Sequence, residues 1–153
     1  MAPRTILLVE DNEDDVFFMQ RAIRACGIEH HVQVAEDGQV AIDYLSGTGQ
    51  YKDRQKFPLP FLIFLDLKMP RRSGLDVLQW IRTQPHLKTM LVLILTTSRE
   101  DSDVQRAYEL GVNSFLVKPM DFEDYTSLSR TVAGFWLERS EAPTFPPEDV
   151  VES

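Results

Sequence analysis

The chain has 153 residues, 43% of them hydrophobic and 26% charged, which is typical of a single globular domain. No segment approaches the roughly 20 apolar residues that a transmembrane helix needs, and we expect no signal peptide before the first predicted strand. The formal net charge of −8, from 24 acids and 16 bases, argues against a general nucleic-acid binder. A lone cysteine, Cys26, cannot form an internal disulfide. We therefore expect a cytoplasmic protein that binds neither membrane nor nucleic acid.

Apolar runs alternate with segments of helical periodicity along the chain. The apolar runs predict strands at residues 5–10, 31–35, 61–66, 91–95 and 114–118. The periodic segments predict helices at residues 14–26, 39–46, 73–83, 103–110 and 121–139. Nearly continuous apolar strands that are each followed by a helix predict an α/β fold, with a doubly wound, five-stranded parallel sheet covered by helices on both faces.

Two segments fall outside this alternation. The connection at residues 47–60 is long for a link between a helix and a strand, so we expect it to lie at the surface. Residues 140–153 are rich in proline and acids, and we expect them to form a disordered tail.

Charged residues stand directly at the ends of three predicted strands. Glu10 and Asp11 end the first strand, Asp66 ends the third, and Lys118 ends the fifth, just before Pro119. Because the carboxyl ends of parallel strands meet at one edge of a sheet, we expect these side chains to converge there. Three carboxylates and a lysine predict a pocket that binds a cation and is directed at phosphate.

Simpler roles exist for these residues. An acid pair at a strand end can cap the following helix, which Asp11 or Asn12 could do here. A lone lysine at a strand end is usually a solvated surface residue. The coincidence of the acid pair with Asp66, and of Lys118 with Pro119, favours the pocket.

Taken together, these residues resemble the receiver domain of two-component response regulators. The resemblance covers about residues 4–139 and preserves the order and spacing of four motifs, which are Val9–Asn12, Leu65–Pro70, Thr96–Ser98 and Phe115–Pro119. It implies a (βα)5 flavodoxin-like receiver fold over 4–139. It also implies that Asp66 accepts a phosphoryl group from the phosphohistidine of a sensor histidine kinase.

The resemblance assigns further roles around Asp66. It implies that Lys118 contacts a phosphoryl oxygen and that a cis peptide before Pro119 aims the lysine inward. A carboxylate such as Asp66 is able to form an acyl phosphate once the incoming charge is neutralised, and Mg²⁺ suits a site with few carboxylates. The implied Mg²⁺ ligands are Glu10, Asp11, Asp66 and the backbone carbonyl of Lys68.

Thr96 and Phe115 correspond to the residues that respond to phosphorylation in receivers. The resemblance implies that the Thr96 hydroxyl bonds the phosphoryl group and that the Phe115 ring turns inward when Thr96 moves. Phe115 lacks the hydroxyl that tyrosine would offer, and an ordinary core aromatic remains an equal interpretation of this position.

The chain resembles one subgroup in particular, the stand-alone response regulators that partner bacterial and cyanobacterial phytochromes. The resemblance lies in the long loop before residue 61, the run Leu93–Ser98 and the aromatic segment Phe135–Glu138. A phytochrome is then the expected kinase; a chemotaxis or motility-type receiver, or a phosphotransfer intermediate for another histidine kinase, is the alternative. We expect no separate enzymatic activity, since a phosphatase with an aspartyl nucleophile usually needs an aspartate where Lys68 stands.

The last predicted helix has more apolar residues than packing on the sheet requires. This surplus predicts a homodimer through the face formed by residues 103–110, 114–118 and 121–139. Trp136 could instead fold back over the edge of the core. The predicted interface residues are Phe122, Tyr125, Phe135 and Trp136.

Overall fold

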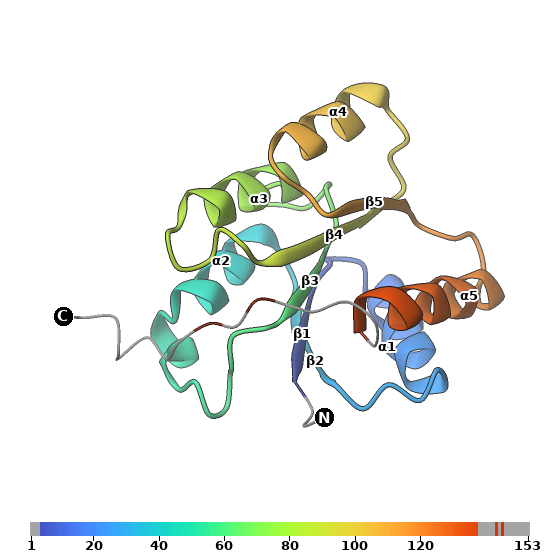
Figure 1. Cartoon of the computed structure of the whole chain (residues 1–153), viewed down its shortest axis with the longest axis horizontal. Helices are drawn as coiled ribbons and strands as arrows, with labels where there is room; N and C mark the ends of the chain where they lie inside the picture. Colours follow the sequence, from blue (N-terminus) through green and yellow to red (C-terminus); the bar gives the residue numbers. More distant parts are fainter. Residues whose placement is uncertain (1–3, 138–142, 144, 146–153) are drawn as a thin grey trace.

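Figure 1 shows the computed structural model of the chain, which describes residues 4–137, 143 and 145. The strands are β1 (Thr5–Val9), β2 (His31–Ala35), β3 (Leu62–Leu65), β4 (Leu91–Thr96) and β5 (Ser114–Val117). The α-helices are α1 (Glu13–Ala25), α2 (Gly38–Ser46), α3 (Gly74–Thr83), α4 (Asp101–Glu109) and α5 (Phe122–Val132). A 3-10 helix, η1 (Gly49–Lys52), follows α2, and a π-helical turn, η2 (Ala133–Leu137), follows α5.

All neighbouring strands of the sheet run parallel, in the order β2-β1-β3-β4-β5. The chain adds β2 on one side of β1 and then returns to add β3, β4 and β5 on the other. This order confirms the predicted doubly wound α/β fold. The direction of strand addition reverses between β1 and β3, and in open α/β sheets ligands bind beyond the carboxyl ends of the strands at such a point.

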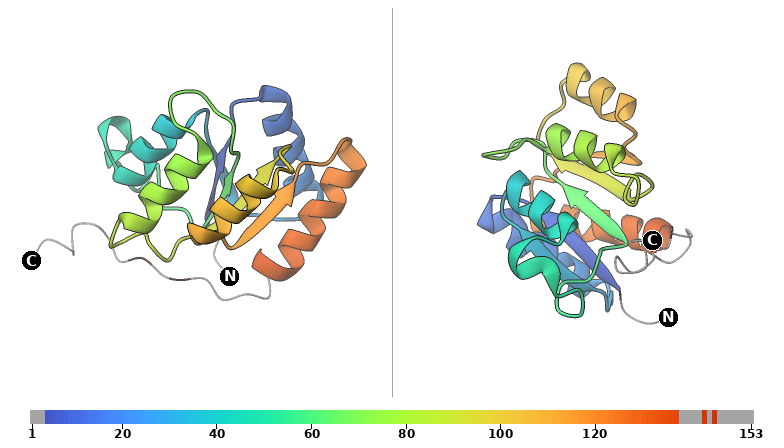
Figure 2. Two further views of the ribbon diagram at one scale, coloured as in Figure 1. Left: turned by 90° about the horizontal axis from the view of Figure 1, so that it is seen from above. Right: turned by 90° about the vertical axis from the view of Figure 1, so that its left-hand side faces the viewer.

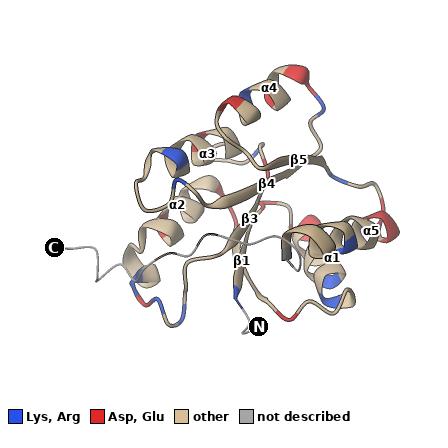
Figure 3. Ribbon diagram, in the orientation of Figure 1, with Lys and Arg blue, Asp and Glu red and all other residues tan. Residues whose placement is uncertain are grey.

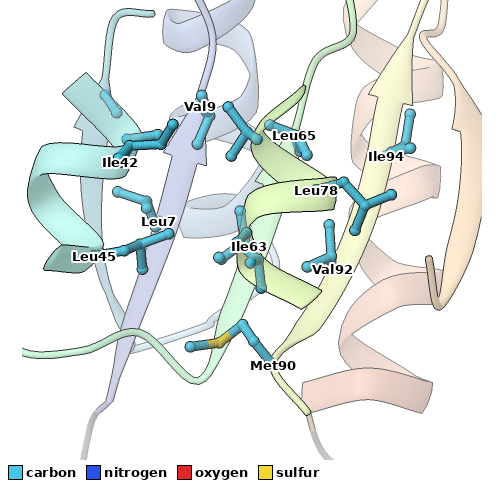
Figure 4. Packing of buried hydrophobic residues seen from close by; sticks show 14 of the residues in the cluster. Leu7, Val9, Ile42, Leu45, Ile63, Leu65, Leu78, Met90, Val92 and Ile94 are labelled. Carbon is cyan, nitrogen blue, oxygen red and sulfur yellow. The ribbon is translucent and has the colours of Figure 1, made fainter. Parts of the chain in front are cut away.

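The helices form a layer on each face of the sheet (Figure 2). Side chains alternate between the faces: Leu7 and Val9 of β1 pack with α2 and α3, while Ile6 and Leu8 pack with α1 and α5. Figure 4 shows the first of these two cores, in which Leu7, Val9 and Ile63 lie among residues of α2 and α3. Because both faces are covered, β1, β3 and β4 are buried along their whole length, which explains their unbroken apolar sequences.

All the described α-helices except α4 begin with a side-chain cap. The side chains of Asn12, Asp37 and Asp121 accept hydrogen bonds from backbone N–H groups of α1, α2 and α5. The first turns of α1, α4 and α5 also carry acids, which lie favourably at the positive end of the helix dipole (Figure 3). These starts fix the direction of each helix as it leaves the edge of the sheet.

The long connection at residues 47–60 is a packed unit. The rings of Tyr44, Tyr51 and Phe57 lie within 5.0–6.0 Å of one another, measured between centroids. The Arg54 guanidinium donates to the carbonyl oxygens of Tyr44 and Leu45 at 2.7 and 3.0 Å. The loop therefore closes the carboxyl end of α2.

The two edge strands of the sheet are β2 and β5. On β5, the backbone N–H of Phe115 donates to the hydroxyl of Tyr108, which comes from α4, at 3.2 Å. A side chain thus satisfies a backbone donor at this edge.

Most of the predicted disordered tail, residues 140–153, lies outside the described residues. Phe145 is an exception, because it packs against the core that α2 and α3 form with the sheet. The predicted last helix, 121–139, ends differently from the expectation: α5 stops at Val132 and continues as the π-helical turn to Leu137. Among the described helices, none combines the length and apolar composition needed to cross a bilayer.

Gly74, the first residue of α3, is where this helix passes closest to the end of β3. A Cβ atom at this position would overlap the carbonyl oxygen of Asp66, and the Gly74 N–H donates to the carbonyl of Leu67 at 2.8 Å. Glycine therefore allows α3 to start directly against the strand end that holds Asp66.

We expect Gly74→Ala to lower the free energy of unfolding by about 1–3 kcal/mol, the usual cost of overpacking against a backbone that cannot retreat. Urea denaturation followed by circular dichroism measures this change. Gly134→Ala is the control, since a Cβ atom on Gly134 would meet none of the described atoms within 4 Å. Equal stability of the two variants would contradict the close approach of α3.

Candidate functional site

Glu10, Asp66 and Lys118 come together at the carboxyl edge of the sheet, and Asp11 lies beside Glu10 and Asp66. Backbone hydrogen bonds continue the strand pairing just past the ends of the strands: Glu10 N–H donates to Ala35 and Asp66 N–H donates to Val9, both at 3.0 Å. Lys118 N–H donates to the carbonyl of Thr96 at 2.7 Å. The backbone of these three residues is therefore fixed by the same hydrogen bonding as the sheet.

Lys118 is the centre of the site. Its Nζ lies 2.6 Å from Glu10 Oε1, 2.8 Å from Asp15 Oδ2 and 3.2 Å from Asp66 Oδ2. The lysine side chain is only 6% exposed. One buried ammonium thus joins carboxylates from the end of β1, the first turn of α1 and the end of β3.

Asp66 is buried, and both of its oxygens have donors. Oδ1 accepts from the backbone N–H of Leu67 at 2.8 Å, while Oδ2 accepts from Lys118. The carboxylate therefore has a fixed orientation at the edge of the sheet.

Three carboxylates of the site could hold a metal ion. One oxygen each from Glu10, Asp11 and Asp66 lies within 4.8 Å of the others, and Asp11 is exposed whereas the other two are buried. Oxygen ligands at this spacing fit a hard divalent cation that retains several waters. The convergence that the sequence predicts for these acids is therefore present.

The charges of the site act strongly on one another. Burial raises the pKa of Glu10 to about 7, opposed by its hydrogen bond to Lys118 and assisted by the nearby Asp66. Hydrogen bonds and charge from Asp15, Glu10 and Asp66 outweigh burial and raise the pKa of Lys118 above its usual range. The lysine is hence charged, while Glu10 lacks sufficient compensation in the absence of a cation.

Asp15 is the site residue that sequence reasoning missed. Its Oδ2 pairs with Lys118, and its Oδ1 accepts from the hydroxyl of Tyr125 on α5 at 3.2 Å. Burial, followed by the charge of Asp15, raises the pKa of the Tyr125 hydroxyl, so it remains a donor. In the sequence Asp15 is one of three acids in the first turn of a helix, a pattern that needs no further explanation than the helix dipole.

The structure places Thr96 and Phe115 on neighbouring strands, β4 and β5. Thr96 ends β4 and is fully buried, and its hydroxyl accepts from the backbone N–H of Ser98 at 3.4 Å. Phe115 is half-buried on β5, opposite Ile94, and packs against the core between the sheet and α2 and α3. This placement suits both a switch residue and an ordinary core aromatic, so the predicted switch stays a prediction.

The loop between β3 and α3 is fixed to α2. Arg71 has a positive φ of 65° and binds both oxygens of Asp37, the residue that caps α2, at 2.8–3.1 Å. Lys68 lies exposed in this loop, and the metal-binding role of its backbone carbonyl stays a prediction.

The expectation of a cis peptide before Pro119 is wrong. No cis peptide occurs among residues 4–137, so the bond between Lys118 and Pro119 is trans. Lys118 nevertheless points into the pocket, because three carboxylates hold its ammonium there.

Two of the predicted dimer residues point into the protomer. Tyr125 is 3% exposed and packs against Phe18 of α1, and Phe122 packs against Phe18 and beneath the Arg21 guanidinium. Both side chains therefore lie between α5 and α1, away from the predicted α4-β5-α5 face. Of the other two, Trp136 is partly buried against the core and Phe135 is exposed beside it.

Comparison with known proteins agrees with this geometry. Residues 6–129 match the model of the response regulator receiver domain. The chain belongs to this receiver family. It is thus a receiver of two-component signalling, as the motifs around Asp66 predict.

The relatives of this receiver include phytochrome response regulators. It is 37% identical to the response regulator Rcp1 of Synechocystis sp., covering 92% of this chain and 94% of that protein. The crystal structure of the phosphorylated cyanobacterial phytochrome response regulator RcpA superposes with a TM-score of 0.87 at 33% identity, covering 94% of this receiver and all of RcpA. The Mn²⁺-bound form of Rcp1 superposes with a TM-score of 0.84, covering 93% of this receiver and all of that chain.

Not every close relative carries a phytochrome name. FilR2 of Methanothrix harundinacea, described as a probable methanogenesis regulatory protein, is 36% identical over 92% of this receiver and 88% of its own length. Membership of the receiver family therefore does not by itself assign the chain to the phytochrome subgroup.

The raised pKa of Glu10 predicts how stability depends on pH without a cation. Since the folded state binds this proton more tightly than the unfolded state, the Glu10 contribution falls as pH rises from about 4.5 to about 7. We expect wild type to lose on the order of 1–3 kcal/mol over this range relative to Glu10→Gln. Urea denaturation in EDTA at several pH values gives both curves.

The two proteins must be compared because His30 also titrates. Burial lowers the pKa of His30, so its contribution to stability rises with pH over part of the range in which the Glu10 contribution falls. The His30 contribution is common to wild type and Glu10→Gln and cancels in the difference. Parallel pH curves for the two proteins would contradict an undercompensated Glu10.

Proposed function

We propose that Asp66 is the phosphoacceptor of this receiver. The observation that carries the proposal is the pairing of a buried carboxylate with the Lys118 ammonium at one oxygen, beside the cluster of Glu10, Asp11 and Asp66. A nucleophilic carboxylate needs a fixed orientation and positive charge nearby to accept a phosphoryl group. Both conditions are met by residues of this chain.

In the proposed reaction, an Asp66 oxygen attacks the phosphorus of a phosphohistidine. The O–P bond forms as the P–N bond breaks, and the electron pair of that bond leaves with the imidazole nitrogen. Lys118 offsets the charge that builds on the phosphoryl oxygens, and the Thr96 hydroxyl at the end of β4 offers a further donor. A divalent cation held by Glu10, Asp11 and Asp66, which we propose is Mg²⁺, would supply the remaining positive charge.

We propose a phytochrome-type sensor histidine kinase as the phosphoryl donor, in the cytoplasm. The support is similarity over nearly the whole chain to Rcp1 and RcpA. The chain would act as a phosphorylated signal carrier and not as an enzyme on a separate substrate. Phosphotransfer from each histidine kinase of the source genome tests the partner: fastest transfer from a kinase without a phytochrome photosensor would favour the chemotaxis or general relay alternative.

We expect wild type to be phosphorylated by acetyl phosphate in MgCl₂ and to remain unmodified in EDTA. Asp66→Asn should remain unmodified in both, because the amide is not nucleophilic toward phosphorus. Intact-protein mass spectrometry measures the modification. Asp14→Asn, which neutralises an exposed acid of α1, is the matched control and should react like wild type. Phosphorylation of Asp66→Asn at the wild-type rate would place the acceptor elsewhere.

We also propose a homodimer, now with Phe135 as its main contact. Phe135 is 58% exposed and its ring lies 4.9 Å from that of Trp136, so η2, the turn that follows α5, presents an aromatic surface. Tyr125 is buried and Phe122 is partly buried against α1, so we no longer propose these two side chains as interface contacts.

Sedimentation equilibrium of Phe135→Ala should give a lower average mass than wild type at the same concentration, because the exposed ring is lost from the interface. Phe17→Ala is the control, since the Phe17 side chain is 55% exposed and lies on α1. An unchanged mass for Phe135→Ala, or a larger effect of Phe17→Ala, would refute this interface.

A further inference from the structure

Asp15 differs from the other two carboxylates that hold Lys118. Glu10 and Asp66 also belong to the cluster of acids that could bind a cation, whereas Asp15 does not. A cation bound by Glu10 and Asp66 would compete with Lys118 for these two carboxylates. Asp15 would then be the carboxylate partner left to Lys118.

Asp15 is itself held in place from two sides. Its backbone N–H donates to the side chain of Asn12 at 3.0 Å, which fixes the start of α1. Its Oδ1 accepts from the hydroxyl of Tyr125, a residue that is 3% exposed between α5 and α1. One oxygen of the carboxylate thus accepts a hydrogen bond from Tyr125 of α5, and the other pairs with Lys118.

We propose that Asp15, oriented by Tyr125, is a positioning residue that holds the Lys118 ammonium away from the cation ligands Glu10 and Asp66. The proposal rests on the cation-dependent phosphorylation of Asp66 proposed above and extends it to residues outside the receiver motifs. Without Asp15, Lys118 would pair more fully with Glu10 and Asp66. The cation would then have to displace the lysine before it could bind.

This role predicts a specific change in the cation requirement. The Mg²⁺ concentration that gives half-maximal phosphorylation by acetyl phosphate should rise on the order of three- to tenfold in Asp15→Asn, as expected for the loss of one charged partner. The maximal rate at saturating Mg²⁺ should stay within about twofold of wild type, because the ligands and Asp66 are intact. A purely structural defect would lower the maximal rate and the melting temperature instead.

Calorimetric titration with MgCl₂ gives the same affinity without the reaction. Asp14→Asn removes an equal charge from the exposed neighbouring residue and should shift the affinity by less than about twofold. In a Lys118→Met background, Asp15→Asn should have no greater effect than Asp14→Asn, since the competing ammonium is gone. Tyr125→Phe should weaken Mg²⁺ binding less than Asp15→Asn and add nothing to it.

The outcomes separate the two proposals. If wild type binds no Mg²⁺ and is not phosphorylated, the proposed function fails first. If wild type responds to Mg²⁺ but Asp15→Asn matches wild type or Asp14→Asn, Asp15 has no positioning role. An effect of Asp15→Asn that persists unchanged in Lys118→Met would also overturn the proposal, because it would not pass through the lysine.

Discussion

The proposed phosphoacceptor site depends on one buried ammonium shared among three carboxylates. Lys118 lies within 3.2 Å of oxygens from Glu10, Asp15 and Asp66, yet a single positive charge cannot balance them and Asp11 as well. The excess negative charge raises the cost of burying Glu10 and at the same time favours a divalent cation. The imbalance that disfavours the ionised form of Glu10 is therefore the same feature that favours the binding of a cation at this site.

Residues at strand ends were predictable because the backbone alone determines where they lie. In a parallel sheet every carboxyl end meets the same edge, so the unbroken apolar runs before Glu10 and Asp66 were enough to place both carboxylates together. Lys118 followed from the same reasoning. The resemblance explains the inward direction of Lys118 by a cis peptide before Pro119, but this peptide is trans. The three carboxylates around the ammonium account for the direction of the side chain instead.

Residues on helices were less predictable, because their directions depend on how each helix is rotated against its neighbours. Three acids open α1, and only the packing of α1 beside α5 distinguishes Asp15 from Glu13 and Asp14. The same contact turns Phe122 and Tyr125 toward α1, whereas their apolar character suggested an external partner. The amphipathic pattern of α5 shows that it has an apolar stripe but does not identify the surface that the stripe contacts.

The phenol of Tyr108 has a consequence for the rim of the sheet at β5. The unpaired backbone groups of an exposed edge strand can pair with a strand of another chain, and proteins commonly prevent this with charged residues or prolines in the edge strand. In this protein the protecting group comes from α4, because the backbone N–H of Phe115 donates its hydrogen bond to the hydroxyl of Tyr108. A foreign strand would have to displace the Tyr108 hydroxyl before it could pair with β5 at this donor, so the protection of this donor against strand addition comes from a helix and not from the sequence of β5.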